Sequence, residues 1–369
     1  MKVQVLQENF LKALNICSRF VSSRVQLPVL ANILLKTNKN KLSLSATNLE
    51  NSVVISIGAK VIKEGEITIP SRIITETISN LDVGTIDLEV EKEILKIKTN
   101  NFESNISGLN SSDFPSIPSE IGINNFEVES DGFLDALNSV LFSVSSDETR
   151  PVLTGVLLII GKEHITLVAT DGFRLSQKKI KNKGIKEEIK FILPKSILSE
   201  LVRVSTSEKI VVSYKKNENQ IIFGLDDIIL SSRIIEGEFP DFERIIPKNT
   251  KFKVNLDRED FLRSVKLAGV FARDSANVVK LRILKDIVQV LAESSQSGSQ
   301  KRELEAKIEK DNSDTFTIAF NYRFLEDFLS VIKGEVVRME FSDPNAPSLF
   351  LDEKDSDFLH IIMPVRLQV

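Results

Sequence analysis

The stretch from Leu167 to Gln177 reads L-V-A-T-D-G-F-R-L-S-Q and has the pattern of a β-hairpin. Apolar and polar positions alternate up to Thr170, Asp171-Gly172 is a strong turn signal, and the alternation resumes at Arg174. The segment before it, R-P-V-L-T-G-V-L-L-I-I from Arg150, is echoed earlier in the chain by L-P-V-L-A-N-I-L-L from Leu27, followed by L-S-L-S-A-T-N. The sequence therefore predicts an internal repeat.

Three segments open alike and define this repeat. They are M-K-V-Q-V-L-Q-E-N-F-L-K-A-L from Met1, N-F-E-V-E-S-D-G-F-L-D-A-L from Asn125 and K-F-K-V-N-L-D-R-E-D-F-L-R-S-V from Lys251. Each predicts a short strand followed by a capped amphipathic helix. A second helix is expected after residues 67–72, 191–196 and 317–323, where Pro70 and Pro194 suit a helix entry.

The repeat length matches one domain, so we expect three domains, at residues 1–118, 124–246 and 250–369. Each would pack two helices on antiparallel sheets, which is an α+β class. In the third repeat, residues 290–299 lack the Asp-Gly turn. The terminal segment F-L-H-I-I-M-P-V-R-L-Q-V is predicted to be a strand that runs to the terminus and is docked against another part of the fold.

The composition is that of a folded, soluble protein. With 42% hydrophobic residues the chain can fill a core in each domain, and its longest aliphatic run, residues 156–160, is far too short to cross a membrane. The N-terminus lacks the pattern of a signal peptide, so we expect a cytoplasmic protein. The single cysteine, Cys17, shares helical spacing with Phe10 and Leu14, which predicts a buried core residue.

Charge and histidine content bear on the function classes. The net charge of −4 disfavours nucleic-acid binding through a generally basic surface, so only a segregated basic surface would serve. His164 and His360 lie far apart without a cluster at metal-ligand spacing. We find no phosphate-binding glycine loop and no nucleophile elbow, and we predict no catalytic residue, metal or cofactor. An enzyme that uses only carboxylates, such as a glycosidase, stays open with 52 acidic residues.

Four motifs in register with the triplication resemble the bacterial DNA sliding clamp, the beta subunit of DNA polymerase III. They are L-P-V-L-A-N-I-L-L, A-T-D-G-F-R-L, E-F-P-D-F-E-R-I-I-P-K and I-M-P-V-R-L, and the match covers the whole chain. The resemblance implies three DNA-clamp domains per chain and a head-to-tail homodimer closed as a ring. It implies a non-catalytic processivity factor that encircles double-stranded DNA without sequence specificity. The implied partners are the replicative polymerase catalytic subunit, the clamp loader and other clamp-motif proteins of replication and repair.

The resemblance also implies a hydrophobic peptide-binding groove between the middle and last domains. Leucine, isoleucine, methionine and proline would supply apolar surface, and Gly172 would let a peptide backbone come close. Phe173 stands where many members of the family have histidine, and Gln368 and Val369 extend beyond the usual end. Carried over by motif, the groove consists of Leu153, Thr170, Gly172, Phe173, Arg174, Leu175, Pro240, Arg244, Ile245, Met363, Pro364, Val365, Arg366 and Leu367.

Two further sets of residues follow from the resemblance. DNA contacts are expected from Arg24, Arg72, Lys195 and Arg203, on an inner surface that is basic only on balance because acidic residues share the same predicted helices. The dimer interface is expected at Ser104 and Ile106 on one face and at Val270 and Phe271 on the other. A static scaffold of three interaction domains, which would keep the groove without encircling DNA, is the remaining alternative.

Overall fold

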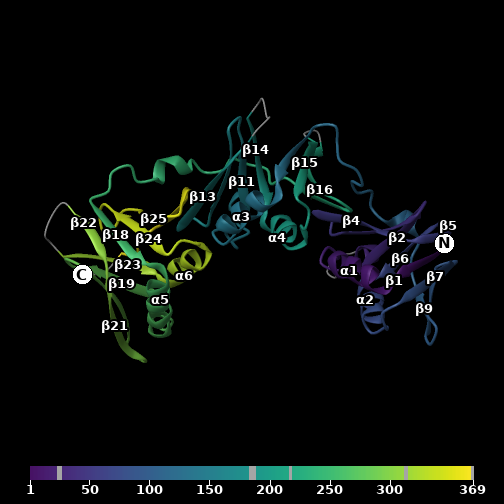
Figure 1. Cartoon of the computed structure of the whole chain (residues 1–369), viewed down its shortest axis with the longest axis horizontal. Helices are drawn as coiled ribbons and strands as arrows, with labels where there is room; N and C mark the ends of the chain where they lie inside the picture. Colours follow the sequence, from purple (N-terminus) through teal and green to yellow (C-terminus); the bar gives the residue numbers. More distant parts are fainter. Residues whose placement is uncertain (23–26, 183–187, 216–217, 311–314, 367–369) are drawn as a thin grey trace. The chain divides into compact units, whose positions relative to one another are not determined.

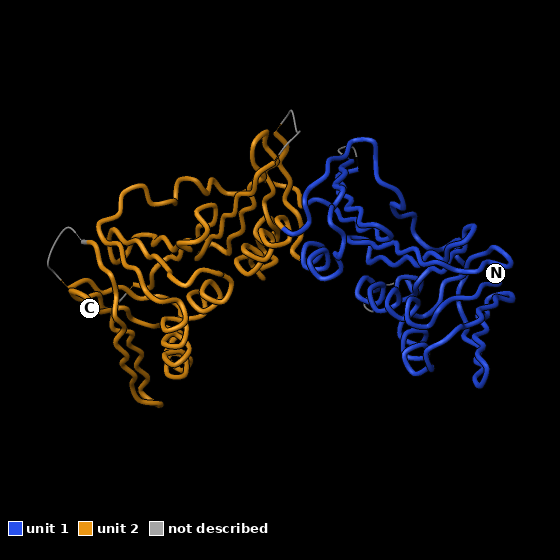
Figure 2. Tube along the Cα trace, in the orientation of Figure 1, with its two compact units in different colours: residues 1–131, 196–234 blue, residues 132–195, 235–369 orange. Residues whose placement is uncertain are grey.

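The computed structural model describes residues 1–22, 27–182, 188–215, 218–310 and 315–366, and its contacts divide the chain into two compact units (Figures 1 and 2). Unit 1 comprises residues 1–131 and 196–234, and unit 2 comprises residues 132–195 and 235–369. The middle repeat therefore contributes to both units. The predicted domain boundaries stay a prediction, because this division follows contacts rather than repeats.

Unit 1 contains a five-stranded sheet, in the order β5-β1-β7-β8-β9, and an eight-stranded sheet, in the order β10-β15-β16-β17-β4-β3-β2-β6. All neighbouring strands are antiparallel. The elements are β1 (Lys2–Leu6), α1 (Gln7–Cys17), η1 (Pro28–Ala31), β2 (Asn32–Asn38), β3 (Lys41–Thr47), β4 (Asn51–Gly58), β5 (Lys60–Lys63), β6 (Glu66–Pro70), α2 (Ser71–Ser79), β7 (Thr85–Glu91), β8 (Ile94–Lys98), β9 (Glu103–Ser107), η2 (Ser111–Asp113), β10 (Asn125–Glu129), α4 (Lys195–Val204), β15 (Lys209–Lys215), β16 (Gln220–Leu225) and β17 (Ile228–Arg233).

Unit 2 contains a nine-stranded sheet, in the order β14-β11-β12-β13-β26-β25-β24-β18-β22, and a four-stranded sheet, in the order β21-β20-β19-β23. Its helices α5 and α6 pack on each other, and α5 also covers β19, β20 and β21. The elements are α3 (Ser130–Leu141), η3 (Pro151–Leu153), β11 (Gly155–Ile160), β12 (His164–Thr170), β13 (Arg174–Lys181), β14 (Ile189–Pro194), η5 (Phe242–Ile245), β18 (Phe252–Asp257), α5 (Arg258–Ala272), β19 (Val278–Ile283), β20 (Ile287–Ser294), β21 (Gly298–Glu305), β22 (Lys307–Lys310), β23 (Phe316–Asn321), α6 (Tyr322–Val331), β24 (Val336–Phe341), β25 (Ser348–Asp352) and β26 (Asp355–Ile362).

One backbone hydrogen bond recurs in all three repeats and confirms the predicted repetition. The N–H groups of Leu109, Ile235 and Val365 donate to the carbonyls of Thr68, Ile192 and Ala319 at 2.9, 2.8 and 2.8 Å. Each acceptor lies three residues before the first residue of α2, α4 or α6. The segment that follows the last strand is therefore hydrogen-bonded in the same way in all three repeats.

The first helix of each repeat also begins in the same way, although the predicted side-chain cap is absent from α1. The first N–H of α1, α3 and α5 donates to the carbonyl just before β7, β15 and β24, namely from Gln7 to Gly84, Ser130 to Glu208 and Arg258 to Glu335, at 2.9, 3.0 and 2.8 Å. Asp257 caps α5 through its side chain, whereas Leu6 gives α1 no side-chain cap, so the predicted cap is wrong there. The tertiary bond satisfies the free N–H group instead.

The hairpin predicted at residues 167–177 is confirmed, with Thr170 paired to Leu175 across the turn. The third repeat keeps a hairpin between β20 and β21, because Gly298 adopts the left-handed conformation at φ +92°.

The terminal segment is docked as predicted, since β26 lies between β13 and β25. The strand ends at Ile362 and does not run to the terminus. Pro364, two residues further on, has no N–H to extend a ladder.

Cys17 is buried as predicted, and burial raises the pKa of its thiol. Among the described residues, no helix is both long enough and apolar enough to pass through a bilayer.

The same substitution should have opposite effects at two helical glycines. A Cβ at Gly269 in α5 would lie 2.7 Å from Tyr322 Cε2, whereas a Cβ at Gly132 in α3 would meet nothing within 4 Å. Alanine usually stabilises a helix by about 0.5–1 kcal/mol over glycine, but overpacking costs about 1–3 kcal/mol. We expect Gly132→Ala to raise the free energy of unfolding and Gly269→Ala to lower it, as measured by urea denaturation. A stabilised Gly269→Ala variant would contradict close α5–α6 packing.

Candidate functional site

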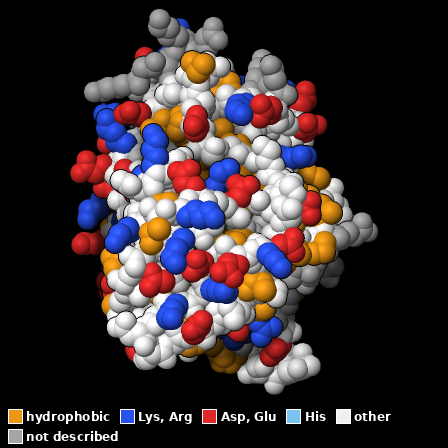
Figure 3. Space-filling model, turned by 90° about the vertical axis from the view of Figure 1, so that its right-hand side faces the viewer, with side chains coloured by type: hydrophobic (Ala, Val, Ile, Leu, Met, Phe, Trp, Pro, Cys, Tyr) orange, Lys and Arg blue, Asp and Glu red, His pale blue; other side chains and the backbone are white. Residues whose placement is uncertain are grey.

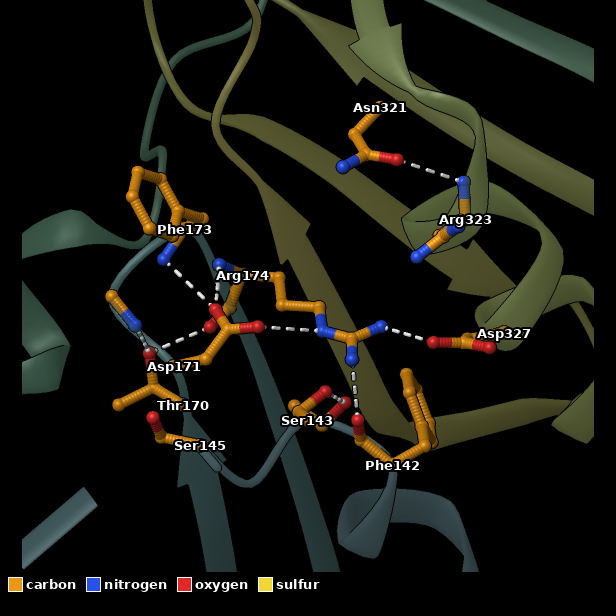
Figure 4. Close-up of polar contacts among 12 residues, drawn as sticks. Phe142, Ser143, Ser145, Thr170, Asp171, Phe173, Arg174, Asn321, Arg323 and Asp327 are labelled. Carbon is orange, nitrogen blue, oxygen red and sulfur yellow. Dashed lines mark hydrogen bonds and ion pairs between the residues drawn. The ribbon is translucent and has the colours of Figure 1, made fainter. Parts of the chain in front are cut away.

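The turn from Thr170 to Arg174 is fixed by its own side chains (Figure 4). The Asp171 carboxylate accepts hydrogen bonds from the N–H groups of Phe173 and Arg174 at 2.9 and 3.0 Å. The Thr170 hydroxyl donates to the Arg174 carbonyl at 2.6 Å and accepts from the Gly172 N–H at 3.0 Å. Gly172 has φ +91°, which glycine adopts without strain. Phe173, 65% exposed, is thus presented to solvent on a rigid turn.

Arg174 joins this turn to helix α6. Its guanidinium pairs with Asp171 at 3.0 Å and with Asp327 of α6 at 2.5 Å, and it donates to the Phe142 carbonyl at 2.6 Å. It also lies over the rings of Phe324 and Phe142, with 4.6 and 5.4 Å to their centroids. The Arg174 side chain is only 10% exposed, so these contacts replace water for a buried cation.

The sequence prediction missed Asp327, which lies 153 residues from Arg174. One signal could have found it. Asp327 is the sixth residue of α6, as Glu200 is the sixth residue of α4, and Glu200 also binds arginines. An alignment of the second helices of the repeats would therefore have shown that a carboxylate recurs at this position, where it can bind an arginine.

The chain after β26 lies against the turn. The N–H of Met363 donates to the Phe173 carbonyl at 2.8 Å, and the N–H of Val365 donates to the Ala319 carbonyl at 2.8 Å. Met363, Pro364 and Val365 are half-buried and Arg366 is exposed, while Leu367 lies outside the described residues. The structure thus brings together the two segments that the sequence nominated for the groove.

The other predicted groove residues differ in depth. Leu153, Thr170 and Leu175 are buried, and Leu175 belongs to an apolar cluster with Leu157, Val168, Ile192 and Ile361. Pro240, Arg244 and Ile245 are exposed on the second connector, whose Phe239, Phe242 and Ile246 pack on that cluster. Arg244 forms an ion pair with Asp241 at 2.7 Å. Leu153, Thr170 and Leu175 therefore lie beneath the surface, whereas Pro240, Arg244 and Ile245 are exposed on it.

Beneath the turn, His360 is buried in an aromatic environment. Its ring stacks on Phe328 with 5.1 Å between centroids, and its Nδ1 lies 2.8 Å from the Ser176 hydroxyl, which in turn lies 2.8 Å from the Ser143 hydroxyl. Burial lowers the pKa of His360 well below its ordinary value, and the Arg174 cation lowers it further. His360 is thus held neutral as part of the core.

Two of the four predicted DNA contacts, Arg72 and Arg203, are paired with carboxylates. Arg72 pairs with Glu76 at 2.9 Å, and Arg203 pairs at 2.7 Å with Glu200, which also binds Arg19 at 2.6 Å. Lys195 is exposed at the start of α4, and Arg24 lies outside the described residues. On the face drawn in Figure 3, cationic and anionic side chains are interspersed. Any contact of these arginines with phosphate competes with a carboxylate neighbour.

The predicted dimer contacts are only partly exposed. Val270 is 56% exposed on α5, and Phe271 packs against the core of unit 2. Ser104 is half-buried on β9. Ile106 was expected to supply apolar contact to a partner, but it is buried because it faces the core opposite Leu95. The structure therefore corrects the prediction for the Ile106 side chain.

Among the described residues, no group of three or more His, Cys, Asp or Glu side chains is placed to hold a metal ion.

Comparison with known proteins defines the class. Three family models match in succession, namely the N-terminal, central and C-terminal domains of the DNA polymerase III beta subunit, at residues 1–118, 127–241 and 243–366. The fold is thus three clamp domains built of helices and antiparallel sheets. The chain belongs to the DNA polymerase III beta subunit family.

Individual relatives cover the chain from end to end. The beta sliding clamp of Staphylococcus aureus (strain Mu50 / ATCC 700699) is 27% identical over 376 residues, covering 99% of both chains. The crystal structure of DNA polymerase III subunit beta from Pseudomonas aeruginosa has a TM-score of 0.93 at 26% identity, and that from Thermotoga maritima has 0.91 at 28%, each covering 100% of both chains.

Arg174 should not tolerate lysine. An ammonium group cannot reach Asp171, Asp327 and the Phe142 carbonyl together, nor lie flat on two rings. We expect Arg174→Lys to lower the free energy of unfolding by about 1–3 kcal/mol, since buried partners lose their hydrogen bonds. Arg244→Lys, at an exposed pair, should change it by less than about 0.5 kcal/mol. Equal effects in urea denaturation would contradict the role assigned to the Arg174 network.

His360 should make stability pH-dependent. Below its ordinary pKa of 6.5 the unfolded chain binds a proton that the folded chain does not, so the free energy of unfolding falls as pH is lowered. The contribution is up to about 1.4 kcal/mol per pH unit. His360→Asn should therefore lose stability less steeply than the unmodified chain between pH 6.5 and about 5.5. Parallel slopes for His360→Asn and the unmodified chain would contradict this prediction.

Proposed function

We propose that two copies of this chain join head to tail as a ring around double-stranded DNA and act as a processivity factor that tethers a DNA polymerase. The proposal rests on the share of the chain that is matched, since three clamp-domain models and relatives named beta sliding clamp match essentially the whole chain. This favours a ring over a scaffold that does not encircle DNA. We infer a non-catalytic accessory subunit that works in the cytoplasm.

Two free sheet edges support ring closure. Strand β9 ends the five-stranded sheet of unit 1, and β21 ends the four-stranded sheet of unit 2, next to the helix α5 that carries Val270. Free edges present unpaired N–H and carbonyl groups that can pair with another chain. If β9 of one copy pairs with β21 of the other, the contact is head to tail, and two such contacts close a dimer. Backbone pairing would then compensate for the buried Ile106.

The ion pairs of Arg72 and Arg203 are compatible with a ring that stays on DNA because it encloses the duplex. A closed ring needs no strong grip on the phosphates, and a strong grip would hinder sliding. Arg72 and Arg203 would make weak contacts that exchange between phosphate and carboxylate neighbours, and Lys195 and Arg24 would add further contacts to phosphate. Sequence specificity is not needed for this role.

We further propose that Phe173 and the segment Met363–Arg366 form a peptide groove for the polymerase catalytic subunit, the clamp loader and other clamp-motif proteins. An exposed aromatic ring on a fixed turn can act as an anchor contact at little entropic cost. Arg150 lies beside Gly172, with its Nη1 3.7 Å from where a Cβ would stand, and Arg366 is exposed. A peptide with apolar anchors and an acidic residue would suit this surface.

Retention on circular DNA tests encirclement. With a clamp loader and ATP, the protein should be loaded on nicked circular DNA, stay bound through gel filtration, and dissociate within minutes after the circle is linearised, because a threaded ring slides off a free end. The measurement is the fraction of labelled protein that elutes with DNA before and after cutting. Linear DNA blocked at both ends serves as the control and should retain the protein. Equal retention on open linear and circular DNA would contradict the ring.

A further inference from the structure

Two exposed arginines of unit 2, Arg273 and Arg323, act on the hydroxyl group of Tyr322. Arg273 follows the last residue of α5, and Tyr322 and Arg323 are the first two residues of α6. The Nε–H of Arg273 donates to the Tyr322 hydroxyl oxygen at 3.3 Å. Burial alone would raise the pKa of Tyr322, but the hydrogen bonds and charges of Arg323 and Arg273 outweigh it, so that this pKa lies below its usual value. The structure therefore places two cations beside one oxygen atom.

The Tyr322 ring is held against helix α5. It is 4% exposed, and a Cβ at Gly269 would lie 2.7 Å from its Cε2. The Tyr322 N–H donates to the Asn277 carbonyl at 2.9 Å. Ala276 and Asn277, in the turn after α5, have φ +52° and +60°, a left-handed conformation that L side chains rarely adopt. Such backbone strain is found mainly where a structure positions groups for function.

Arg323 lacks the carboxylate that its counterpart has in the first repeat. Arg72 is the second residue of α2, as Arg323 is of α6, and it pairs with the sixth residue, Glu76, at 2.9 Å. The sixth residue of α6 is Asp327, which binds the nearly buried Arg174 instead (Figure 4). The carboxylate that would compensate Arg323 is thus used in the core contact.

The site offers hydrogen-bond donors without a compensating anion. In the described part of the chain, Arg273 and Arg323 form no ion pair, and the carboxylates nearest to them in sequence, Asp274 and Glu326, pair with neither. The Tyr322 hydroxyl accepts from Arg273, so its own hydrogen is left to donate, and no acceptor for it lies among the described residues. Two guanidinium groups and one hydroxyl at one place suit an anion with several acceptor oxygens.

We propose that Arg273, Tyr322 and Arg323 form a phosphate-binding site in the third repeat. The two guanidinium groups would donate to phosphate oxygens, and the hydroxyl would donate to a further one. The phosphate would belong to the backbone of double-stranded DNA, which rests on the function proposed above, or to a free phosphate compound. Unlike Arg72 and Arg203, this site would bind phosphate without competition from a carboxylate neighbour.

Salt dependence tests whether the two arginines share one phosphate. A short fluorescein-labelled DNA duplex is titrated with the full chain by fluorescence polarisation at several salt concentrations. Each neutralised phosphate contributes about −0.9 to the slope of log K against log salt concentration, so the double variant Arg273→Gln/Arg323→Gln should lose about 0.9 of slope and not about 1.8. The losses of affinity in the two single variants should not multiply in the double variant.

Arg282→Gln is the matched control, because it removes an exposed cation from β19 of the same unit, away from the site. It should keep the slope of the unmodified chain. A loss of about 1.8 in the double variant, with multiplied losses of affinity, would overturn the shared site, since the two arginines would then be independent surface charges. Dissociation of the dimer by either single variant would also overturn it, because the arginines would then bind a second copy of the chain.

Tyr322→Phe separates the site from general charge. The variant keeps the ring and both cations, so its melting temperature and salt slope should stay unchanged, yet it should bind the duplex about tenfold more weakly because one hydrogen bond to phosphate is lost. Unchanged affinity would remove Tyr322 from the site.

Inorganic phosphate tests the site without DNA. The chain has two tyrosines and no tryptophan, so the ultraviolet absorbance of ionised phenol follows Tyr322, with Tyr322→Phe as the blank. Bound phosphate should raise the pKa of Tyr322, because a nearby anion disfavours the phenolate, whereas chloride at equal ionic strength should not. A raised pKa with unchanged DNA binding in the variants would support a site for free phosphate and exclude DNA as its ligand. No effect of phosphate or of the variants would overturn the site, while retention on circular DNA would still measure the ring.

Discussion

Antiparallel pairing between the last strand of one repeat and the hairpin of the preceding repeat is the interaction on which both units depend. In unit 1, β17 pairs with β4, with Ser232 opposite Asn51; in unit 2, β26 pairs with β13, with Ile362 opposite Arg174. These ladders join residues far apart in sequence and extend each sheet across two repeats. Loop closure over such distances costs little more than over short ones, and the ladder satisfies backbone groups on both strands. Each turn is then hydrogen-bonded at the end of the partner strand, Glu50 to Arg233 in unit 1 and Phe173 to Met363 in unit 2. The peptide groove that we propose lies at the end of the β13–β26 ladder in unit 2.

Because the repeats share one backbone arrangement, differences in their roles come from their side chains. Glu200 and Asp327 occupy equivalent positions in α4 and α6, and both bind arginines. Glu200 holds Arg19 and the exposed Arg203, whereas Asp327 holds the nearly buried Arg174 against two aromatic rings. The first arrangement lowers the charge that a helix surface offers to phosphate, and the second fixes one repeat to the next. The same carboxylate position thus binds arginines at a helix surface in α4 and a nearly buried arginine in α6.

The fold was predictable where the sequence signal is local. The Asp-Gly hairpin, the threefold strand-helix opening, the buried Cys17 and the docked terminal strand all follow from periodicity within about a dozen residues. The Arg174 contacts with Phe142 and Asp327 were not predictable, because they depend on which strands become neighbours. The missing side-chain cap on α1 is replaced by a tertiary bond to Gly84, which no local pattern records. Ile106 was assigned to an interface by resemblance, although its alternation within β9 places it opposite Leu95 in the core. Within the candidate site, the turn and the tail were found and their anchor was missed.

Cys17 has a practical consequence for anyone who handles this protein. It is the only cysteine in the sequence, its side chain has no accessible surface, and burial keeps its thiol protonated. Maleimides and other sulfhydryl reagents attack the accessible thiolate, so the folded chain should behave toward them as if it were cysteine-free. A cysteine introduced at an exposed position outside the proposed interfaces, such as Val83, would then be the sole point of attachment for a fluorophore or spin label, without prior removal of a native one.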